Sequence, residues 1–267
     1  MLFDTHCHLD AEYFPEGPAA VLERARAAGV GAFACVGVGS LAQTQNAAAL
    51  AEQFPNVVAT AGIHPHDAST ADAALEAELE ALASRPRVVA VGEVGLDYHY
   101  DHSPRDVQRG VFARAIALAR RVKKPLVIHT RSAAADTLDV LEAEAARDVG
   151  GIIHCFSEDR AFAERALELG FYLSFSGILT FKNARAVHEV AAWAPEDRLL
   201  VETDSPYLAP VPLRGKTCEP AYVTHTAARL AELRETPLDR IQAVTTENAL
   251  RLFRLVLTAE GLLPASP

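Results

Sequence analysis

Short apolar runs alternate with longer amphipathic, alanine-rich runs along nearly the whole chain. We expect the short runs to be β-strands and the longer runs to be helices, because strand and helix differ in length and in hydrophobic period. The eight expected strands are 2–6, 32–38, 57–63, 88–94, 125–130, 151–156, 171–177 and 199–204. The expected helices are 18–28, 41–53, 71–84, 105–123, 133–147, 159–168, 183–193, 220–235 and 237–254.

This alternation predicts the fold class. Apolar strands separated by helices are typical of a parallel sheet that is covered by helices. Eight such units in 267 residues favour a closed (β/α)8 TIM barrel over an open doubly wound sheet. We expect residues 1–260 to form a single barrel domain and residues 261–267 to be a tail.

Composition and net charge argue against several classes of function. The net charge of −10 argues against a broad basic surface for duplex nucleic acid, although bound divalent cations can create a local phosphate site. The sequence has no apolar stretch long enough to span a membrane and no secretory signal pattern, so we expect a cytoplasmic protein without membrane association. The four cysteines form no CxxC pair, which favours free thiols. Nothing in the sequence implies an obligate protein partner.

Polar residues interrupt the apolar strands at their C-terminal ends, which meet at one rim of a TIM barrel. A single histidine at such a place is usually a hydrogen-bonded loop or core residue. Here, however, the pattern recurs on most of the strands and so predicts a metal site. The residues concerned are His6 and His8 after the first strand, His64 after the third, Glu93 on the fourth, His129 on the fifth, His154 on the sixth, and Glu202 and Asp204 on the eighth.

These histidines and carboxylates outnumber the four ligands of one tetrahedral zinc ion. Their number therefore favours a site for two divalent ions. Imidazole and carboxylate ligands without thiolate are compatible with Zn²⁺, Mn²⁺, Co²⁺ or Mg²⁺. A carboxylate with two oxygens can bridge two ions, and we expect Glu93 to do so. We expect His6, His8 and Asp204 to hold one ion, and His129 and His154 to hold the other.

A set of motifs in the sequence resembles a known family. "DTHCHLD", "GIHPH", "GEVGLDYH", "PLVIHTR", "IIHCFS", "ETDSPYL", "RGK…EP" and "TTENALRLF" occur in the order found in TatD-type metal-dependent deoxyribonucleases, a branch of the amidohydrolase superfamily. The resemblance extends from about residue 3 to residue 254.

The resemblance implies a TIM barrel that hydrolyses phosphodiester bonds in DNA, often from the 3′ end, so that single strands or 3′ ends of DNA would be its partners. It implies the same metal ligands: His6, His8, Glu93, His129, His154 and Asp204. The sequence departs from the family at Cys218, where Asn is common, which puts substrate contacts or loop order in question.

The expected mechanism is hydrolysis by a metal-activated water. Asp204 would be both a metal ligand and the general base, and Glu93 would be catalytic as the bridge. Glu202 is either a carboxylate that orients a histidine ligand or a hydrogen-bonded core residue.

Four further residues are candidates for contacts with the substrate phosphate. His64 would contact the phosphate or a leaving oxygen, with a structural role in the "HPH" turn as the alternative. Arg131, Arg214 and Lys216 would contact phosphates, with exposed loop charges as the alternative.

Two other functions remain open from the sequence. The same chemistry suits another ester or amide bond, such as the ester of aminoacyl-tRNA. A metal-binding or scaffolding protein with a vestigial site is the third possibility, and the intact set of ligands argues against it.

Overall fold

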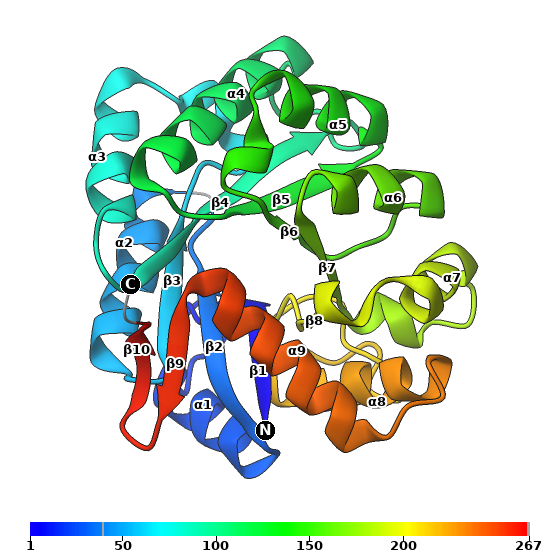
Figure 1. Ribbon diagram of the computed structural model, residues 1–267. Coiled ribbons are helices and arrows are strands. Elements are labelled where there is room, and N and C mark those ends of the chain that lie inside the picture. Colours follow the sequence, from blue (N-terminus) through cyan, green and yellow to red (C-terminus); the bar gives the residue numbers. More distant parts are fainter. Residues whose placement is uncertain (39, 266–267) are drawn as a thin grey trace.

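The computed structural model describes residues 1–38 and 40–265. In this part of the chain, eight parallel strands follow one another around a single sheet in the order of the sequence (Figure 1). The strands are β1 Leu2–Cys7, β2 Val30–Val36, β3 Val57–Ala61, β4 Val88–Asp97, β5 Leu126–Arg131, β6 Gly151–Ile153, β7 Phe171–Phe175 and β8 Leu199–Val201. The α-helices are α1 Pro18–Ala27, α2 Leu41–Gln53, α3 Ala73–Ala83, α4 Arg105–Val122, α5 Ala134–Ala143, α6 Arg160–Glu168, α7 Arg185–Trp193, α8 Val223–Leu233 and α9 Leu238–Phe253.

The sheet closes between its first and last strands. The backbone N–H of Asp204 donates to the carbonyl of His6, and the N–H of His8 donates to the carbonyl of Ser205, both at 2.9 Å. Cys7 and Ser205 form a parallel bridge at the same place. The predicted (β/α)8 barrel is therefore confirmed, and it is closed by the segments that carry three of the predicted metal ligands.

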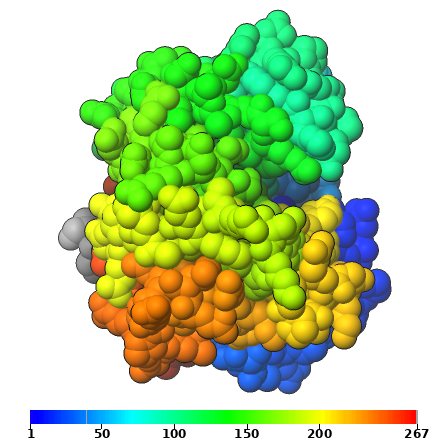
Figure 2. All heavy atoms as spheres, turned by 90° about the vertical axis from the view of Figure 1, so that its right-hand side faces the viewer, coloured from blue at the N-terminus to red at the C-terminus, as the bar shows by residue number. Residues whose placement is uncertain are grey.

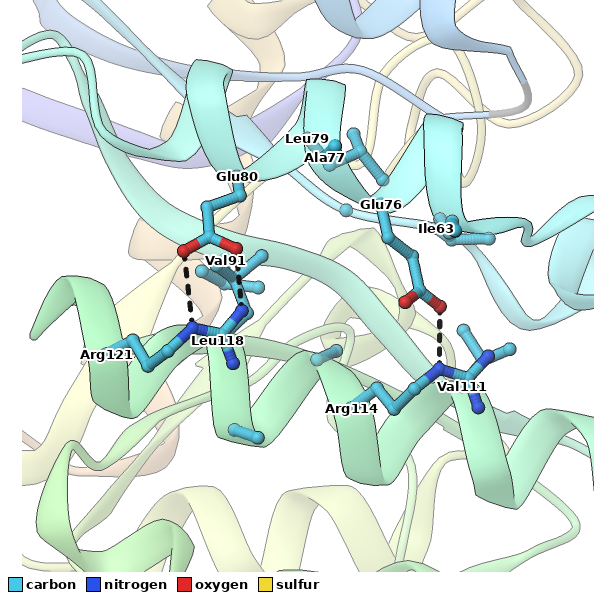
Figure 3. Close-up of a pocket in the computed structure, with 14 residues that line it drawn as sticks. Ile63, Glu76, Ala77, Leu79, Glu80, Val91, Val111, Arg114, Leu118 and Arg121 are labelled. Atoms are coloured by element: carbon cyan, nitrogen blue, oxygen red, sulfur yellow. Dashed lines mark hydrogen bonds and ion pairs between the residues drawn. The ribbon is translucent and has the colours of Figure 1, made fainter.

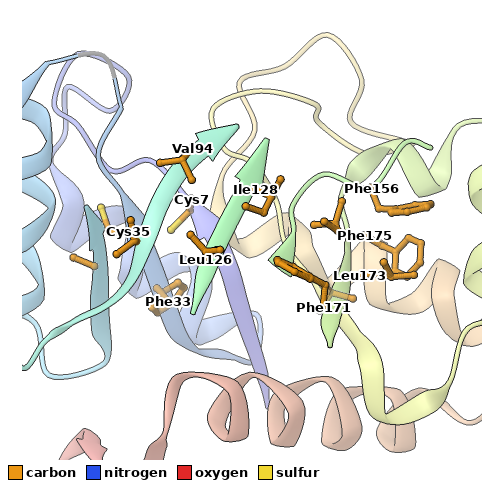
Figure 4. Packing of buried hydrophobic residues seen from close by; sticks show 14 of the residues in the cluster. Cys7, Phe33, Cys35, Val94, Leu126, Ile128, Phe156, Phe171, Leu173 and Phe175 are labelled. Atoms are coloured by element: carbon orange, nitrogen blue, oxygen red, sulfur yellow. The ribbon is translucent and has the colours of Figure 1, made fainter. Parts of the chain in front are cut away.

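The larger hydrophobic cluster lies between the strands and the surrounding helices. Side chains two residues apart on one strand share this layer, such as Phe33 with Cys35 and Leu126 with Ile128 (Figure 4). This spacing follows from the alternation of side chains along a strand. Burial of one such large side chain contributes about 1.5–3 kcal/mol, so this layer makes the largest contribution to stability.

A second cluster fills the inside of the barrel and includes Phe3, Ala32 and Ala34. Helix α9 covers its lower end, where the strands begin, and Phe253 packs on Phe3 with their ring centroids 5.8 Å apart (Figure 1). Asn248 ties this helix to the barrel, because its Nδ2 donates to the carbonyls of Glu196 and Leu199 at 2.9 Å each. The opposite end, where the strands end, is left for the functional groups.

The expected tail is wrong for residues 261–264. Leu255–Thr258 and Gly261–Pro264 are strands β9 and β10, which pair in an antiparallel hairpin. Leu262 is buried, its N–H donates to the carbonyl of Pro55 at 2.8 Å, and its own carbonyl accepts from Arg87 at 3.0 Å. Two apolar runs on either side of a short turn form a hairpin here, which the sequence analysis overlooked. Residues 266–267 lie outside the described residues.

No helix in the described part of the chain is long and apolar enough to cross a lipid bilayer.

Candidate metal centre

Glu93 lies at the centre of the cluster of predicted ligands. Its Oε2 lies 3.3 Å from Nε2 of His6. Its other oxygen, Oε1, lies 2.8 Å from Nδ1 of His129 and 3.0 Å from Nε2 of His154. The two oxygens of one carboxylate therefore face different imidazoles from different strands.

Irregularities in two strands direct the ligands into the mouth of the barrel. Between Asp4 and Cys7 the register of β1 against β2 shifts, and β4 shifts against β5 between Gly92 and Val94. Each irregularity adds a residue to one strand, which changes the direction of the side chain there. His6 and Glu93 occupy these two irregular segments.

Asp204 completes the cluster from a loop. Its Oδ1 lies 3.7 Å from Nε2 of His6 and 3.6 Å from Nε2 of His8. Strand β8 ends at Val201, so Glu202 and Asp204, which were expected on this strand, lie beyond its end. The backbone of Asp204 has a φ of 59°, a left-handed conformation that a regular strand does not contain.

Hydrogen bonds fix the rings of two histidines. Nδ1 of His8 lies 2.7 Å from the carbonyl of Val36, which leaves Nε2 free to act as a ligand. Nδ1 of His154 lies 3.0 Å from Oε1 of Glu202, which also accepts from the N–H of Cys155 at 2.7 Å. Glu202 is thus placed where a carboxylate can orient a histidine ligand, as the sequence suggested.

His6 provides the test of whether this cluster fits a metal. Its side chain is completely buried, and neither ring nitrogen makes a well-aligned hydrogen bond, although Nε2 faces carboxylate oxygens of Glu93 and Asp204 at 3.3 and 3.7 Å. Burial, together with the neighbouring His154, lowers the pKa of His6 and so favours a neutral imidazole. A buried nitrogen without a partner is costly, and a divalent cation would satisfy it. The donor set of imidazoles and carboxylates therefore fits divalent metal ions.

The charges of the carboxylates also suit a cation. Burial alone would raise the pKa of Glu93, but the imidazoles of His154, His64 and His129 outweigh burial and hold it well below its usual value. Burial would likewise raise the pKa of Asp204, and the neighbouring histidines lower it instead. Both groups are therefore ionised at neutral pH.

The four residues predicted to contact phosphate lie in two different environments. His64 joins the cluster, because its Nε2 lies 3.4 Å from Oε1 of Glu93. Arg131 is exposed at the end of β5, and Arg214 and Lys216 are exposed in the segment after β8.

Asp97, which was not among the residues predicted from the sequence, ends β4 and is fully buried. Its Oδ2 lies 3.2 Å from Nε2 of His129 and 2.9 Å from Nε2 of His66. Burial would raise the pKa of Asp97, but His129, the N–H of Tyr100 and His66 lower it. Asp97 lies four residues after Glu93 in "GEVGLD". This spacing was the indication in the sequence that the strand continues as far as Asp97.

Asp4 was missed as well. Thr203 donates to it from both Oγ1, at 2.6 Å, and the backbone N–H, at 2.9 Å, which connects β1 with the loop that carries Asp204. Burial raises the pKa of Asp4 to about 8. The role of Asp4 is therefore to hold the closing seam of the barrel.

Cys218, the departure from the family pattern, is fully buried. Its backbone N–H donates to the carbonyl of Pro206 at 2.9 Å, so the loop after β8 is held by the main chain at this point. The order of this loop segment therefore does not require an amide side chain at position 218.

A separate hollow of about 340 Å³ lies outside the barrel, between α3 and α4 (Figure 3). Its floor is apolar, and ion pairs of Glu76 with Arg114 at 2.6 Å and Glu80 with Arg121 at 2.8 Å cross between the helices. Among the described residues that line it, none is a histidine or a cysteine. This hollow is thus unlike the metal centre in its chemistry.

A parallel eight-stranded barrel with imidazoles and carboxylates gathered at its C-terminal mouth defines a metal-dependent hydrolase. Comparison with known proteins agrees. Residues 3–254 match the family described as "TatD related DNase". The chain is 45% identical to the uncharacterized metal-dependent hydrolase YabD of Bacillus subtilis, over 96% of this chain and 100% of that protein.

Two further relatives extend the comparison. The chain is 34% identical to a protein of Citrobacter rodentium named "3'-5' ssDNA/RNA exonuclease TatD", over 96% of this chain and 99% of that one. The crystal structure of YJJV, a TatD homologue from Escherichia coli, superimposes with a TM-score of 0.87 and 31% identity, covering 94% of this chain and 97% of the other. The chain belongs to the TatD family of metal-dependent hydrolases.

Proposed function

We propose that this protein hydrolyses phosphodiester bonds in DNA and acts at the 3′ ends of single strands. The description of the family and the name of the Citrobacter relative support nucleic acid as the substrate. The proposed cofactor is a pair of divalent ions, of zinc, manganese, cobalt or magnesium. The proposed ligands are His6, His8 and Asp204 for one ion and His129 and His154 for the other, with Glu93 shared between them.

This proposal rests on one observation, which is that the two carboxylate oxygens of Glu93 face different histidines. One oxygen faces His6, whereas the other faces His129 and His154. Two sets of nitrogen donors on either side of one carboxylate suit two ions better than one.

Divalent ions bound there would lower the pKa of a water molecule and neutralise the charge that develops on the phosphate. Asp204 accepts the proton of the attacking water, because it is ionised and its side chain is 15% exposed, so that water reaches it. His64, whose pKa is lowered by burial, is neutral and donates a hydrogen bond to a phosphate or leaving oxygen.

The cationic side chains at the rim bind the strand. Arg131, Arg214 and Lys216 are exposed, and each can contact a phosphate oxygen without displacing a core residue. The overall charge of −10 disfavours a long duplex, which supports a short contact with a strand end.

An assay of the metal-reconstituted protein tests this function. Oligonucleotides labelled at the 5′ or the 3′ end, single- or double-stranded, would be compared with an aminoacyl ester and a simple amide, with and without a chelator. We expect metal-dependent shortening of single strands from the 3′ end. The Asp204→Asn variant is the control for a contaminating nuclease. Cleavage of the ester or the amide but not of DNA would contradict the proposal and favour the alternative hydrolase.

A further inference from the structure

Two aromatic side chains are unusually exposed for their size. Among the large hydrophobic side chains of the described residues, Tyr100 and Tyr207 are the exposed aromatic ones, each 49% accessible. Single exposed apolar residues are ordinary on a protein surface. Tyr207, however, contacts the predicted ligand His8, and Tyr100 contacts His66, whose ring in turn lies 6.3 Å from that of the predicted ligand His129.

Tyr207 flanks one side of the centre. It follows Asp204 in a tight turn, since its N–H donates to the carbonyl of Asp204 at 2.8 Å. Its ring centroid lies 6.1 Å from that of His8, and its hydroxyl lies 3.2 Å from that of Tyr13. The ring is thus held in a fixed orientation at the rim while half of its surface faces solvent.

Tyr100 flanks the other side. Its ring lies parallel to that of His102, with centroids 5.6 Å apart and an angle of 4°. The ring of His66, which contacts Asp97, meets it edge-on at 5.4 Å. The guanidinium of Arg131 lies over one face of the Tyr100 ring, 4.7 Å from its centroid, while the side chain as a whole stays 49% exposed, so a cation that can bind phosphate and an accessible aromatic edge and surface occur together.

The topology separates the two rings. Tyr100 follows β4 and Tyr207 follows β8, and strands four places apart in a ring of eight lie on opposite sides of it. In Figure 2 the teal segment around β4 and the gold segment after β8 lie on two sides of a recess at the right of the view. A flexible strand that enters the mouth would therefore meet one tyrosine on each side of the ions.

We infer that Tyr100 and Tyr207 are stacking surfaces for the bases of a single-stranded nucleic acid. This inference rests on the proposed function, since it assigns residues that recognise the substrate. Aromatic side chains bind single strands by stacking with little dependence on sequence, and the loss of one such contact weakens binding by roughly 5- to 140-fold. The rings would hold the terminal nucleotides while the scissile phosphate lies at the ions.

The test compares Tyr100→Ala and Tyr207→Ala with Tyr→Phe and Tyr→Trp at the same positions. Leu238→Ala, an exposed apolar residue at the start of α9, is the matched control. Each protein would be assayed on a single-stranded oligonucleotide and on the same strand with abasic sites at its last three nucleotides. Binding of the intact strand would be measured in parallel by fluorescence anisotropy.

We expect each alanine variant to raise KM and the dissociation constant for the intact strand by about tenfold, with kcat nearly unchanged. Phenylalanine and tryptophan should restore both, and the abasic strand should remove the difference between wild type and variants. Equal KM and binding for wild type and both alanine variants would overturn the inference alone. Base-dependent binding through the tyrosines without cleavage would instead overturn the proposed function, and a wild type that neither binds nor cleaves DNA would overturn both.

Discussion

The ring of His154 is held between two carboxylates: its Nδ1 lies 3.0 Å from Oε1 of Glu202, and its Nε2 lies 3.0 Å from Oε1 of Glu93. Glu202 is completely buried, and its Oε1 also accepts from the N–H of Cys155 at 2.7 Å. A carboxylate in this position fixes the tautomer and the orientation of a histidine that binds a metal.

Replacement of Glu202 should therefore weaken metal binding without removing a ligand. We expect Glu202→Leu to lower the affinity for divalent ions by about 10- to 100-fold, as measured by competition with a chromogenic chelator. Glu202→Gln keeps an oxygen that can accept from His154 and should recover part of the loss. Equal affinity in wild type and the leucine variant would show that His154 does not depend on this contact.

Glu93→Gln tests the shared carboxylate. An amide has one oxygen and a nitrogen that cannot bind a cation, so a bridge between two ions is lost. We expect elemental analysis after dialysis to find fewer ions per chain than in wild type, with at most one retained. An unchanged stoichiometry would contradict the bridging role.

Asp204→Asn tests the proton acceptor. The amide is nearly the same size and cannot take up the proton, so hydrolysis should fall by about 10²- to 10⁴-fold while circular dichroism stays as in wild type. The rate would be measured at saturating metal, so that weaker metal binding does not explain the loss. A variant that keeps most of its rate would refute the role of Asp204 as the base.

The order of the elements could be predicted from the sequence, whereas the ends of several strands could not. The expected strand at 199–204 is regular only to Val201, and the one at 151–156 only to Ile153. Asp204 and Cys155, which lie beyond these points, have φ angles of 59° and 45°. The chain leaves the sheet where its side chains turn toward the site, and hydrophobic periodicity carries no information about such local backbone conformations.

The cluster of imidazoles and carboxylates could be predicted, because polar residues at strand ends stand out against apolar neighbours. Asp97 and Asp4 escaped notice because their roles depend on partners far away in the sequence, His129 for the first and Thr203 for the second. The exposed rings of Tyr100 and Tyr207 gave no signal either, since exposure is a property of the folded surface.

The thiol of Cys35 predicts how stability depends on pH. Burial raises the pKa of Cys35 from its usual value near 9.0 to about 12. Because the folded chain holds this proton more tightly, its contribution to stability is complete below pH 9 and is lost as the pH rises toward 12. Between pH 9 and 11 the free energy of unfolding, obtained from denaturant titrations, should fall with pH more steeply for wild type than for Cys35→Ala, by about 1 kcal/mol per pH unit. Parallel slopes would contradict the prediction.

Phe253 anchors α9 to the lower end of the barrel through its contact with Phe3. We expect Phe253→Ala to lower the free energy of unfolding by about 3–5 kcal/mol, because it removes a buried aromatic ring and leaves a cavity. Leu263→Ala, at an exposed position of the neighbouring hairpin, should change it by less than about 0.5 kcal/mol. Similar losses in both variants would show that the helix end is not packed as described.

The seam where Asp204 meets His6 has a consequence for biosynthesis. The centre draws on the first strand and on the segment after the last strand, so a growing polypeptide has no complete site until residue 204 and its flanking loop have left the ribosome. The nascent chain therefore cannot bring the imidazoles and carboxylates of this cluster together before nearly the whole barrel has been synthesised.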